Sequence, residues 1–276
     1  MIGAMIGDIA GSRFEFDRSP KTVDGYEVFD RFCEFTDDTV MTVGVAEGLL
    51  NAGKDADMET IRKSVIRSMG KFGKRYPNAG YGGRFFCWVL GPEEEAKPYG
   101  SYGNGSAMRV SSAGWLYDSL ERTREVARAT AEVSHNHPEG IRGAEAVAAA
   151  IYMARTGSTK EEIRQYTEKE FGYDLNRTCD EIRPSYRHIE TCQETVPQAF
   201  AAFFEGDSFE GVIRLAISLG GDCDTLTDIA AAMAEAFYGA DPELVRQALT
   251  FLPEDMKAVY ERFCGPGYRI ERSRRS

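Results

Sequence analysis

The residues of this sequence that are best suited to chemistry form two short clusters of aspartate and threonine. Thr36-Asp37-Asp38-Thr39 precedes an apolar stretch, and Asp222-Cys223-Asp224-Thr225 repeats the arrangement in the second half of the chain, with Asp228 one helical turn further on. One such side chain is enough to cap a following helix. Adjacent carboxylates with threonine, present in both halves, favour metal ligands over simple capping.

The physical argument for metal ligands is electrostatic. Two carboxylates about 4 Å apart repel by about 4 kcal/mol at an effective dielectric constant of about 20. If the two clusters converge, several such repulsions accumulate, and cations are needed to offset them. Ligands that are all oxygen suit hard ions such as Mg²⁺ or Mn²⁺ rather than zinc. The six cysteines agree with this, because they are scattered and form no CxxC pair.

Histidine and glycine-rich segments supply a second set of candidates. His135 and His137 are two residues apart, so we expect at most one of them to face a site and to hydrogen-bond a substrate oxygen. The segments 80–83 and 100–105 are rich in glycine, and the second runs into a predicted helix at about Ala107, which suits binding of a phosphate. Neither segment matches a nucleotide-triphosphate or dinucleotide fingerprint. Cys223 lacks a basic partner and has acidic neighbours, which argues against a nucleophilic thiolate.

Helices are the elements predicted to position these residues. Apolar periodicity predicts helices over residues 39–51 (after Asp37 and Asp38 as caps), 122–134, 139–156, 209–219, 224–238 and 241–251. Alternating strand-like runs are almost absent, so the predicted fold class is all-α. Gly3, Gly7 and Gly11 are interpreted as a glycine-dense loop near the start of the chain.

Length and composition favour one domain. The chain has 276 residues, 42% of them hydrophobic, and no evident linker. A net charge of −11 argues against general affinity for nucleic acid or anionic membranes. No signal-peptide pattern, membrane span or disulfide framework is recognised, which predicts a cytoplasmic protein. We expect a catalytic domain over residues 1–268 and a basic, disordered tail over 269–276.

In combination, these motifs resemble those of the ADP-ribosylglycohydrolases, which include dinitrogenase-reductase-activating glycohydrolase and the ADP-ribosylhydrolases of animals. The resemblance extends from Gly3-Ala-Met-Ile-Gly-Asp8 to Tyr238-Gly239. It rests on four motifs in order: Thr36–Thr39, Gly100-Ser-Tyr-Gly-Asn-Gly105, Ser134-His-Asn-His-Pro138 and Gly220-Gly-Asp-Cys-Asp-Thr225.

The resemblance implies a compact, single-domain, orthogonal helical bundle with a binuclear Mg²⁺ or Mn²⁺ site. It assigns Thr36, Asp37 and Asp38 to one ion and Asp222 and Thr225 to the other, with Asp224 bridging them. It identifies Glu15 with the acidic residue of the family's mobile first loop, and His135 with its substrate-facing histidine. The expected diphosphate and ribose cradle comprises Gly80, Gly82, Gly83, Ser101, Tyr102, Gly103 and Asn104.

The implied reaction is hydrolysis of the glycosidic bond between ADP-ribose and a protein side chain (arginine or serine) or a small-molecule conjugate. Glu15, Asp37 or Asp38 would activate water, and free ADP-ribose would be the product. Two alternatives stay open at this point. One is a non-catalytic ADP-ribose-binding or structural protein on the same fold, and the other is a metal-dependent phosphohydrolase that uses the same aspartates.

Overall fold

The computed structural model describes residues 1–265 and confirms the prediction of an all-α fold. Over this range helices and their connecting loops account for the chain, and the only pairing of β type is an isolated bridge between Gly103 and Thr191. No helix between residues 1 and 265 is both long and apolar enough to cross a membrane. The predicted basic tail, 269–276, lies outside the described residues.

The helices follow one another in this order: α1 (Ile2–Ser12), α2 (Asp37–Ala52), α3 (Met58–Arg75), α4 (Gly83–Leu90), the 3₁₀ helix η1 (Glu93–Glu95), α5 (Gly105–Met108), α6 (Ser111–Leu116), α7 (Leu120–Glu132), α8 (Pro138–Arg155), α9 (Lys160–Phe171), α10 (Cys179–Ile182), α11 (Cys192–Glu205), α12 (Phe209–Leu219), α13 (Cys223–Tyr238), α14 (Pro242–Phe251) and α15 (Glu254–Phe263). The periodic stretches of the sequence correspond to α2, α7, α8, α12, α13 and α14.

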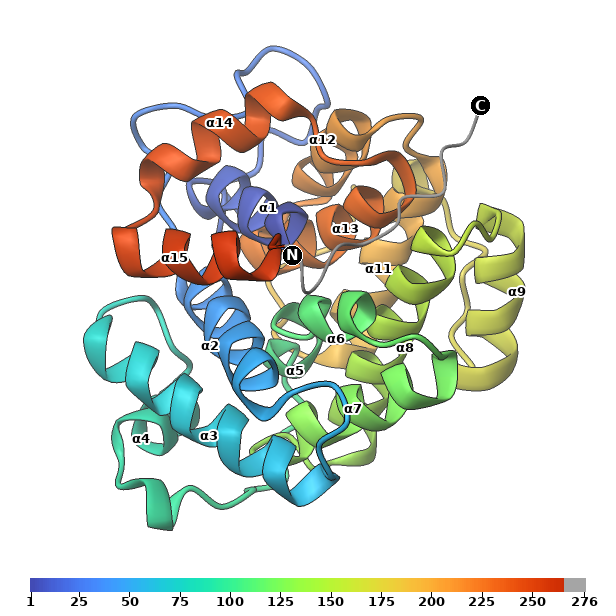
Figure 1. Ribbon diagram of the computed structural model, residues 1–276. Helices are drawn as coiled ribbons and strands as arrows, with labels where there is room; N and C mark the ends of the chain where they lie inside the picture. The colour runs from blue at the N-terminus through green and yellow to red at the C-terminus, as the bar shows by residue number, and fades with distance from the viewer. Residues whose placement is uncertain (266–276) are drawn as a thin grey trace.

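Helix α13 is the centre of the fold. Its residues from Cys223 to Glu235 are all buried, because α1, α8, α11 and α12 pack around it. Figure 1 shows α1 beside α13, with α14 and α15 next to this pair and α2 leading away from it towards α3. An apolar sequence on every side of a helix is what such a central position requires.

The expectation of a glycine-dense loop at the start of the chain was wrong, since these residues form α1. Gly3, Gly7 and Gly11 are four residues apart, so they share the face of α1 that lies against α13. A Cβ atom at Gly7 would lie 2.3 Å from the carbonyl oxygen of Thr227, and one at Gly3 would lie 2.4 Å from that of Ala231. The glycines therefore allow close contact between the two helix backbones rather than a turn.

The start of α2 also differs slightly from the prediction. Thr36 caps the helix through its Oγ1, which accepts a hydrogen bond from the Asp38 backbone N–H at 3.3 Å. Asp37 and Asp38 are consequently helical residues of the first turn, not caps. On α13 the corresponding residue Asp222 occupies the N-cap position without making a capping side-chain bond. Both acidic clusters thus lie at helix N-termini, with their carboxylates available for other partners.

We predict that Gly7→Ala lowers the free energy of unfolding by about 1–3 kcal/mol, because the added methyl group forces α1 away from α13. Gly70→Ala is the matched control. Gly70 also lies inside a helix, α3, but a Cβ there would meet only the Val89 carbonyl oxygen at 3.9 Å. That change should raise stability by up to about 1 kcal/mol through helix propensity. Urea unfolding of both variants measures the difference, and equal effects would contradict the close-contact account.

Candidate functional site

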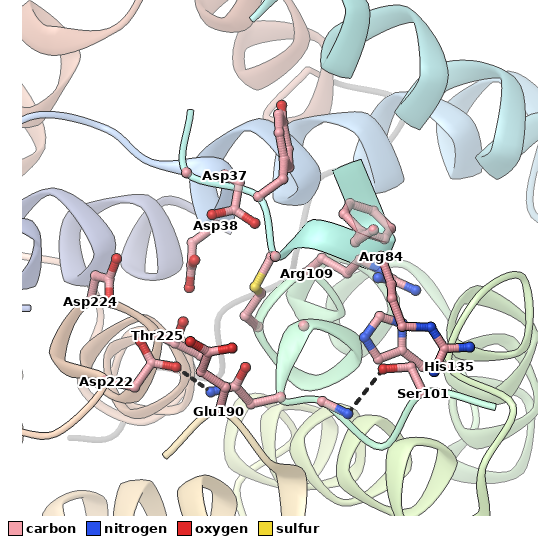
Figure 2. A pocket seen from close by; sticks show the side chains of 18 of the residues that line it. Asp37, Asp38, Arg84, Ser101, Arg109, His135, Glu190, Asp222, Asp224 and Thr225 are labelled. Carbon is pink, nitrogen blue, oxygen red and sulfur yellow. Dashed lines mark hydrogen bonds between the residues drawn. The ribbon is translucent and has the colours of Figure 1, made fainter. Parts of the chain in front are cut away.

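All but two of the predicted site residues line one cavity of about 430 Å³. Figure 2 shows carboxylates of α2 and α13 at one end of this cavity, and Arg84, Ser101, Arg109 and His135 at the other. The predicted residues that line it are Glu15, Asp37, Asp38, Gly80, Gly82, Gly83, Ser101, Gly103, Asn104, His135, Asp222, Asp224 and Thr225. Thr36 and Tyr102, which were also predicted, are not part of the lining.

The acidic end brings together residues from distant parts of the sequence. Carboxylate oxygens of Asp8, Asp38 and Asp224 all lie within 4.8 Å of one another, and these three residues are buried. Oxygen atoms of Glu15 and Asp222 lie equally close to each other and to a ring nitrogen of His188. The convergence assumed in the electrostatic argument is therefore present in the fold.

Asp8 belongs to this cluster, although sequence reasoning missed it as a site residue. Its Oδ1 accepts a hydrogen bond from Thr36 Oγ1 at 2.7 Å, and its Oδ2 accepts from the backbone N–H groups of Thr36 (2.9 Å) and Thr39 (3.0 Å). This carboxylate holds the first turn of α2 in place. The available signal was its position as a single charged residue in an otherwise apolar segment.

Several carboxylate oxygens of the cluster are buried without a hydrogen-bond donor, which is the observation that tests whether a cation fits here. Among the described residues, neither Asp38 Oδ1 nor Asp224 Oδ1 has a partner. Burial raises the pKa of Asp38 well above its usual range, and the charge of Asp224 adds to this. Burial and the charge of Asp222 do the same for Asp224. Oxygen-only donors in need of positive charge fit a hard divalent cation.

Glu15 approaches the cluster from the loop that follows α1. Burial, followed by the negative charge of Asp222, raises its pKa to about 7. The neighbouring Phe16 packs its ring against that of His188 at a centroid distance of 5.1 Å. Further along the loop, Ser19 Oγ donates to the Ile217 carbonyl at 2.6 Å and Lys21 Nζ donates to that of Leu219 at 2.5 Å. The loop is thus fixed to the end of α12, with Glu15 beside Asp222.

The other end of the cavity carries neutral and cationic donors. The Ser101 hydroxyl accepts a hydrogen bond from the Gly103 backbone N–H at 3.2 Å, and the ring of His135 lies directly behind this loop. Arg84 and Arg109 line the same region, and Glu190 lines the cavity as well. Sequence reasoning missed all three of these residues, since none of them lies in a repeated or recognisable charge pattern.

Three predicted residues have contacts that refine their expected roles. Asn104 does not present a free amide, because its Nδ2 donates to Asp222 Oδ2 at 2.6 Å and to Thr195 Oγ1 at 3.1 Å. Tyr102 is 48% exposed, and its ring packs against His137 at 5.3 Å, outside the cavity. His137 caps α8 by accepting from the Glu139 N–H, which leaves His135 as the histidine of this motif that lines the cavity.

Cys223 is fully buried, and burial followed by the charge of Asp224 raises the pKa of its thiol. This agrees with the expectation that it is not a nucleophile. No disulfide joins any of the six cysteines, all of which lie within residues 1–265.

Comparison with known proteins finds similarity to ADP-ribosylhydrolases, the group that the sequence motifs indicate. The human ADP-ribosylhydrolase ARH3 is 27% identical to this chain over an alignment that covers 90% of this chain and 87% of the relative. The ADP-ribosylarginine hydrolase Tri1 of Pseudomonas putida strain GB-1 is 26% identical, with 90% and 72% covered. A solved structure described as an ADP-ribosylglycohydrolase-related protein complex has the same fold, with a TM-score of 0.66, 23% identity and 94% of each chain covered.

The sequence profile of one family, ADP-ribosylglycohydrolase, matches residues 1–269. This range contains both acidic clusters, both glycine-rich loops and the histidine motif. The chain therefore belongs to the ADP-ribosylglycohydrolase family.

Proposed function

We propose that this protein hydrolyses the glycosidic bond between ADP-ribose and a modified protein side chain (arginine or serine) or a small-molecule conjugate, and releases free ADP-ribose. The observation that carries the proposal is the division of one cavity into two ends. The acidic end suits cations and ribose hydroxyls, and the opposite end suits a diphosphate. Family membership and the names of the relatives support the same reaction.

We assign two divalent cations, Mg²⁺ or Mn²⁺, to the acidic end. Thr36, Asp37 and Asp38 would hold one ion, Asp222 and Thr225 the other, and Asp224 would contribute to both. The orphaned oxygens of Asp38 and Asp224 support this assignment. Bound there, such ions would orient the ribose hydroxyls and act as Lewis acids. Thr36 does not line the cavity, and its hydroxyl donates to Asp8, so it would offer only a lone pair.

Glu15 is the carboxylate we assign as general base, with Asp37 and Asp38 as the alternatives. It lines the cavity and has a pKa of about 7, which suits proton abstraction from water near neutral pH. The water oxygen would bond to the anomeric carbon as the bond to the leaving group breaks, and the leaving group would take the electron pair. The surrounding carboxylates would stabilise the positive charge that develops on the ribose ring.

The diphosphate is assigned to Gly80, Gly82, Gly83, Ser101, Gly103 and His135. Gly80 has a φ of +104°, a conformation that favours glycine, and the Asp37 backbone N–H donates to the preceding Ala79 carbonyl at 2.7 Å. This links the glycine loop directly to the start of α2. We assign Asn104 to holding Asp222 rather than to contacting phosphate, because its amide hydrogens are already used.

The proposed activity predicts ADP-ribose release that depends on a divalent cation. Incubation with ADP-ribosylated peptides should yield ADP-ribose, chelation with EDTA should stop the release, and Mg²⁺ or Mn²⁺ should restore it. Mass spectrometry of the products is the measurement. Full turnover after metal analysis has confirmed complete chelation would refute the metal assignment. AMP as the product would instead indicate a phosphohydrolase, and no product with any conjugate would favour a binding or structural role.

Removing one carboxylate should separate activity from stability. We expect Asp224→Asn and Asp37→Ala each to lose most turnover while circular dichroism stays helical. In the metal-free protein, Asp224→Asn should be more stable than the parent by about 1 kcal/mol or more at pH 8, since one repulsive charge is gone. The exposed Asp55→Asn should change neither property. Near-normal turnover in a variant would exclude that residue from the site.

The same carboxylates set the sign of a pH effect on the metal-free protein. The folded-state pKa of Asp8 is raised from 3.8 to about 6, and that of Glu15 from 4.5 to about 7. The folded state then binds more protons than the unfolded state within these intervals, so the free energy of unfolding falls as pH rises from about 4 to 7. Saturating Mg²⁺ should flatten this slope. Urea unfolding across the interval tests it, and a rise in stability would contradict the account.

A Ser101→Ala change probes the diphosphate end independently of the metals. Binding of free ADP-ribose should weaken by about 1–3 kcal/mol if a charge-assisted hydrogen bond is lost. Metal content should stay normal, because Ser101 lies at the opposite end of the cavity from the acidic cluster. Calorimetric titration with ADP-ribose and metal analysis measure the two effects. Unchanged affinity would place the diphosphate elsewhere.

A further inference from the structure

Arg109 is a fully buried cation whose surroundings the proposed function does not yet explain. It directly follows α5 and lines the cavity, yet none of its surface is exposed. Its Nη2 donates to the Thr130 carbonyl at 3.0 Å and to Ser134 Oγ at 2.9 Å. Among the described residues, its Nε and Nη1 have no hydrogen-bond partner. A buried guanidinium without a paired carboxylate is costly, so this position calls for a role in binding or positioning.

The bond to Ser134 determines what that hydroxyl can do next. A serine hydroxyl has one proton to donate and two lone pairs that accept. An arginine only donates, so Ser134 Oγ accepts from Arg109 and keeps its own proton for another partner. His135 Nδ1 lies 2.8 Å from Ser134 Oγ. Ser134 is completely buried, and no other acceptor for its proton is recorded within residues 1–265.

Two proton arrangements are conceivable for the Ser134–His135 contact. If Nδ1 carried the proton, it would donate to Ser134 Oγ, which already accepts from Arg109, and the buried hydroxyl proton would be left without an acceptor. Such an unsatisfied buried group costs about 1–3 kcal/mol. If Ser134 donates to Nδ1 instead, its hydroxyl both accepts from Arg109 Nη2 and donates, and neither Ser134 Oγ nor His135 Nδ1 is left unsatisfied. The second arrangement is therefore favoured.

A hydrogen bond from Ser134 to Nδ1 also determines the protonation of Nε2, on the opposite side of the His135 ring. When Nδ1 accepts, the proton of a neutral imidazole must sit on Nε2. Nε2 faces the glycine loop, since Cβ atoms placed on Gly105 and Gly103 would lie 3.2 Å and 3.4 Å from it. The rings of Phe85 and Tyr99 flank the imidazole, each at 6.1 Å. Burial, followed by the charge of Arg109, lowers the pKa of His135 well below its usual range, which keeps the ring neutral.

We propose that Arg109 and Ser134 are positioning residues that hold His135 as the neutral Nε2–H tautomer, which presents a hydrogen-bond donor to the diphosphate of ADP-ribose. The identity of the ligand rests on the proposed function, whereas the tautomer does not. In this role His135 binds an anion through a proton that it retains, and it does not act as a general acid.

Nuclear magnetic resonance of the ligand-free protein, labelled with ¹⁵N in the histidine rings, tests the tautomer directly. The chain has three histidines, so a His135→Asn variant identifies the resonance. The parent at pH 7 should show the Nε2–H tautomer. Ser134→Ala removes the donor to Nδ1 and should give a mixture of tautomers, whereas Ser134→Thr keeps a hydroxyl and should restore the parent pattern.

Two further variants complete the series. Ser112→Ala removes another fully buried hydroxyl, for which residues 1–265 supply no hydrogen-bond partner, so it should leave the tautomer unchanged. Arg109→Met should mix the tautomers as Ser134→Ala does. If Arg109→Met does not fold, comparison of Ser134→Ala with Ser134→Thr still tests the proposal. An Nδ1–H or doubly protonated ring in the parent would overturn the proposal, as would a Ser134→Ala variant that keeps the parent tautomer.

Calorimetric titration with ADP-ribose then links the tautomer to binding. The dissociation constant should rise about tenfold or more in Ser134→Ala and return towards the parent value in Ser134→Thr. If the parent binds ADP-ribose and Ser134→Ala binds it equally well, the positioning role is wrong. If the tautomer behaves as expected but the parent does not bind ADP-ribose, the proposed function fails while the arrangement of Arg109, Ser134 and His135 stands.

Discussion

Repulsion among buried carboxylates is the constraint on which the rest of this structure depends. Asp8, Asp38 and Asp224 are brought within 4.8 Å of one another in the interior, and burial raises the pKa of each. At this spacing every additional negative charge costs several kcal/mol unless a cation or a proton offsets it. The fold must therefore hold these groups together against their own repulsion, and the surrounding packing can be understood as the means of doing so.

The contact between α1 and α13 provides much of that support. Glycines at positions 3, 7 and 11 let the two backbones touch, which places Asp8 directly beside the first turns of α13. Asp8 then fixes the first turn of α2 through three hydrogen bonds. Asn104, which immediately precedes α5, holds Asp222 through a hydrogen bond of 2.6 Å. One buried helix pair thus sets the position of both acidic clusters.

The two ends of the cavity carry opposite charges, which separate sets of residues provide. At the acidic end, several carboxylates lie close together, and bound cations would offset their negative charge. The other end contains Arg109, a buried positive charge, together with a neutral histidine and glycine backbone. Under the proposed function, a ligand that joins ribose hydroxyls to a diphosphate matches this order of charges. The separation also explains why changes at one end are expected to leave the other intact.

Much of this arrangement could be predicted from the sequence, and the exceptions have physical reasons. Thr36–Thr39 and Asp222–Thr225 were recognisable because their composition exceeds what capping needs, and the apolar periodicity of α8 and α13 is strong. Helix α1 was mistaken for a loop, since glycine disfavours helices unless a neighbouring backbone requires it, and that neighbour is more than 200 residues away in the chain. Asp8 and Arg109 were missed because only tertiary packing gives them their roles.

Manganese titration followed by electron paramagnetic resonance tests the central claim most directly. If the carboxylate cluster exists to hold a pair of cations, the protein should bind two Mn²⁺ ions per chain. Their spectrum should show magnetic coupling between ions close together in space, and Asp224→Asn should abolish this coupling. Binding of a single uncoupled ion, or of none, would contradict the account, as would a coupled pair that persists in Asp224→Asn.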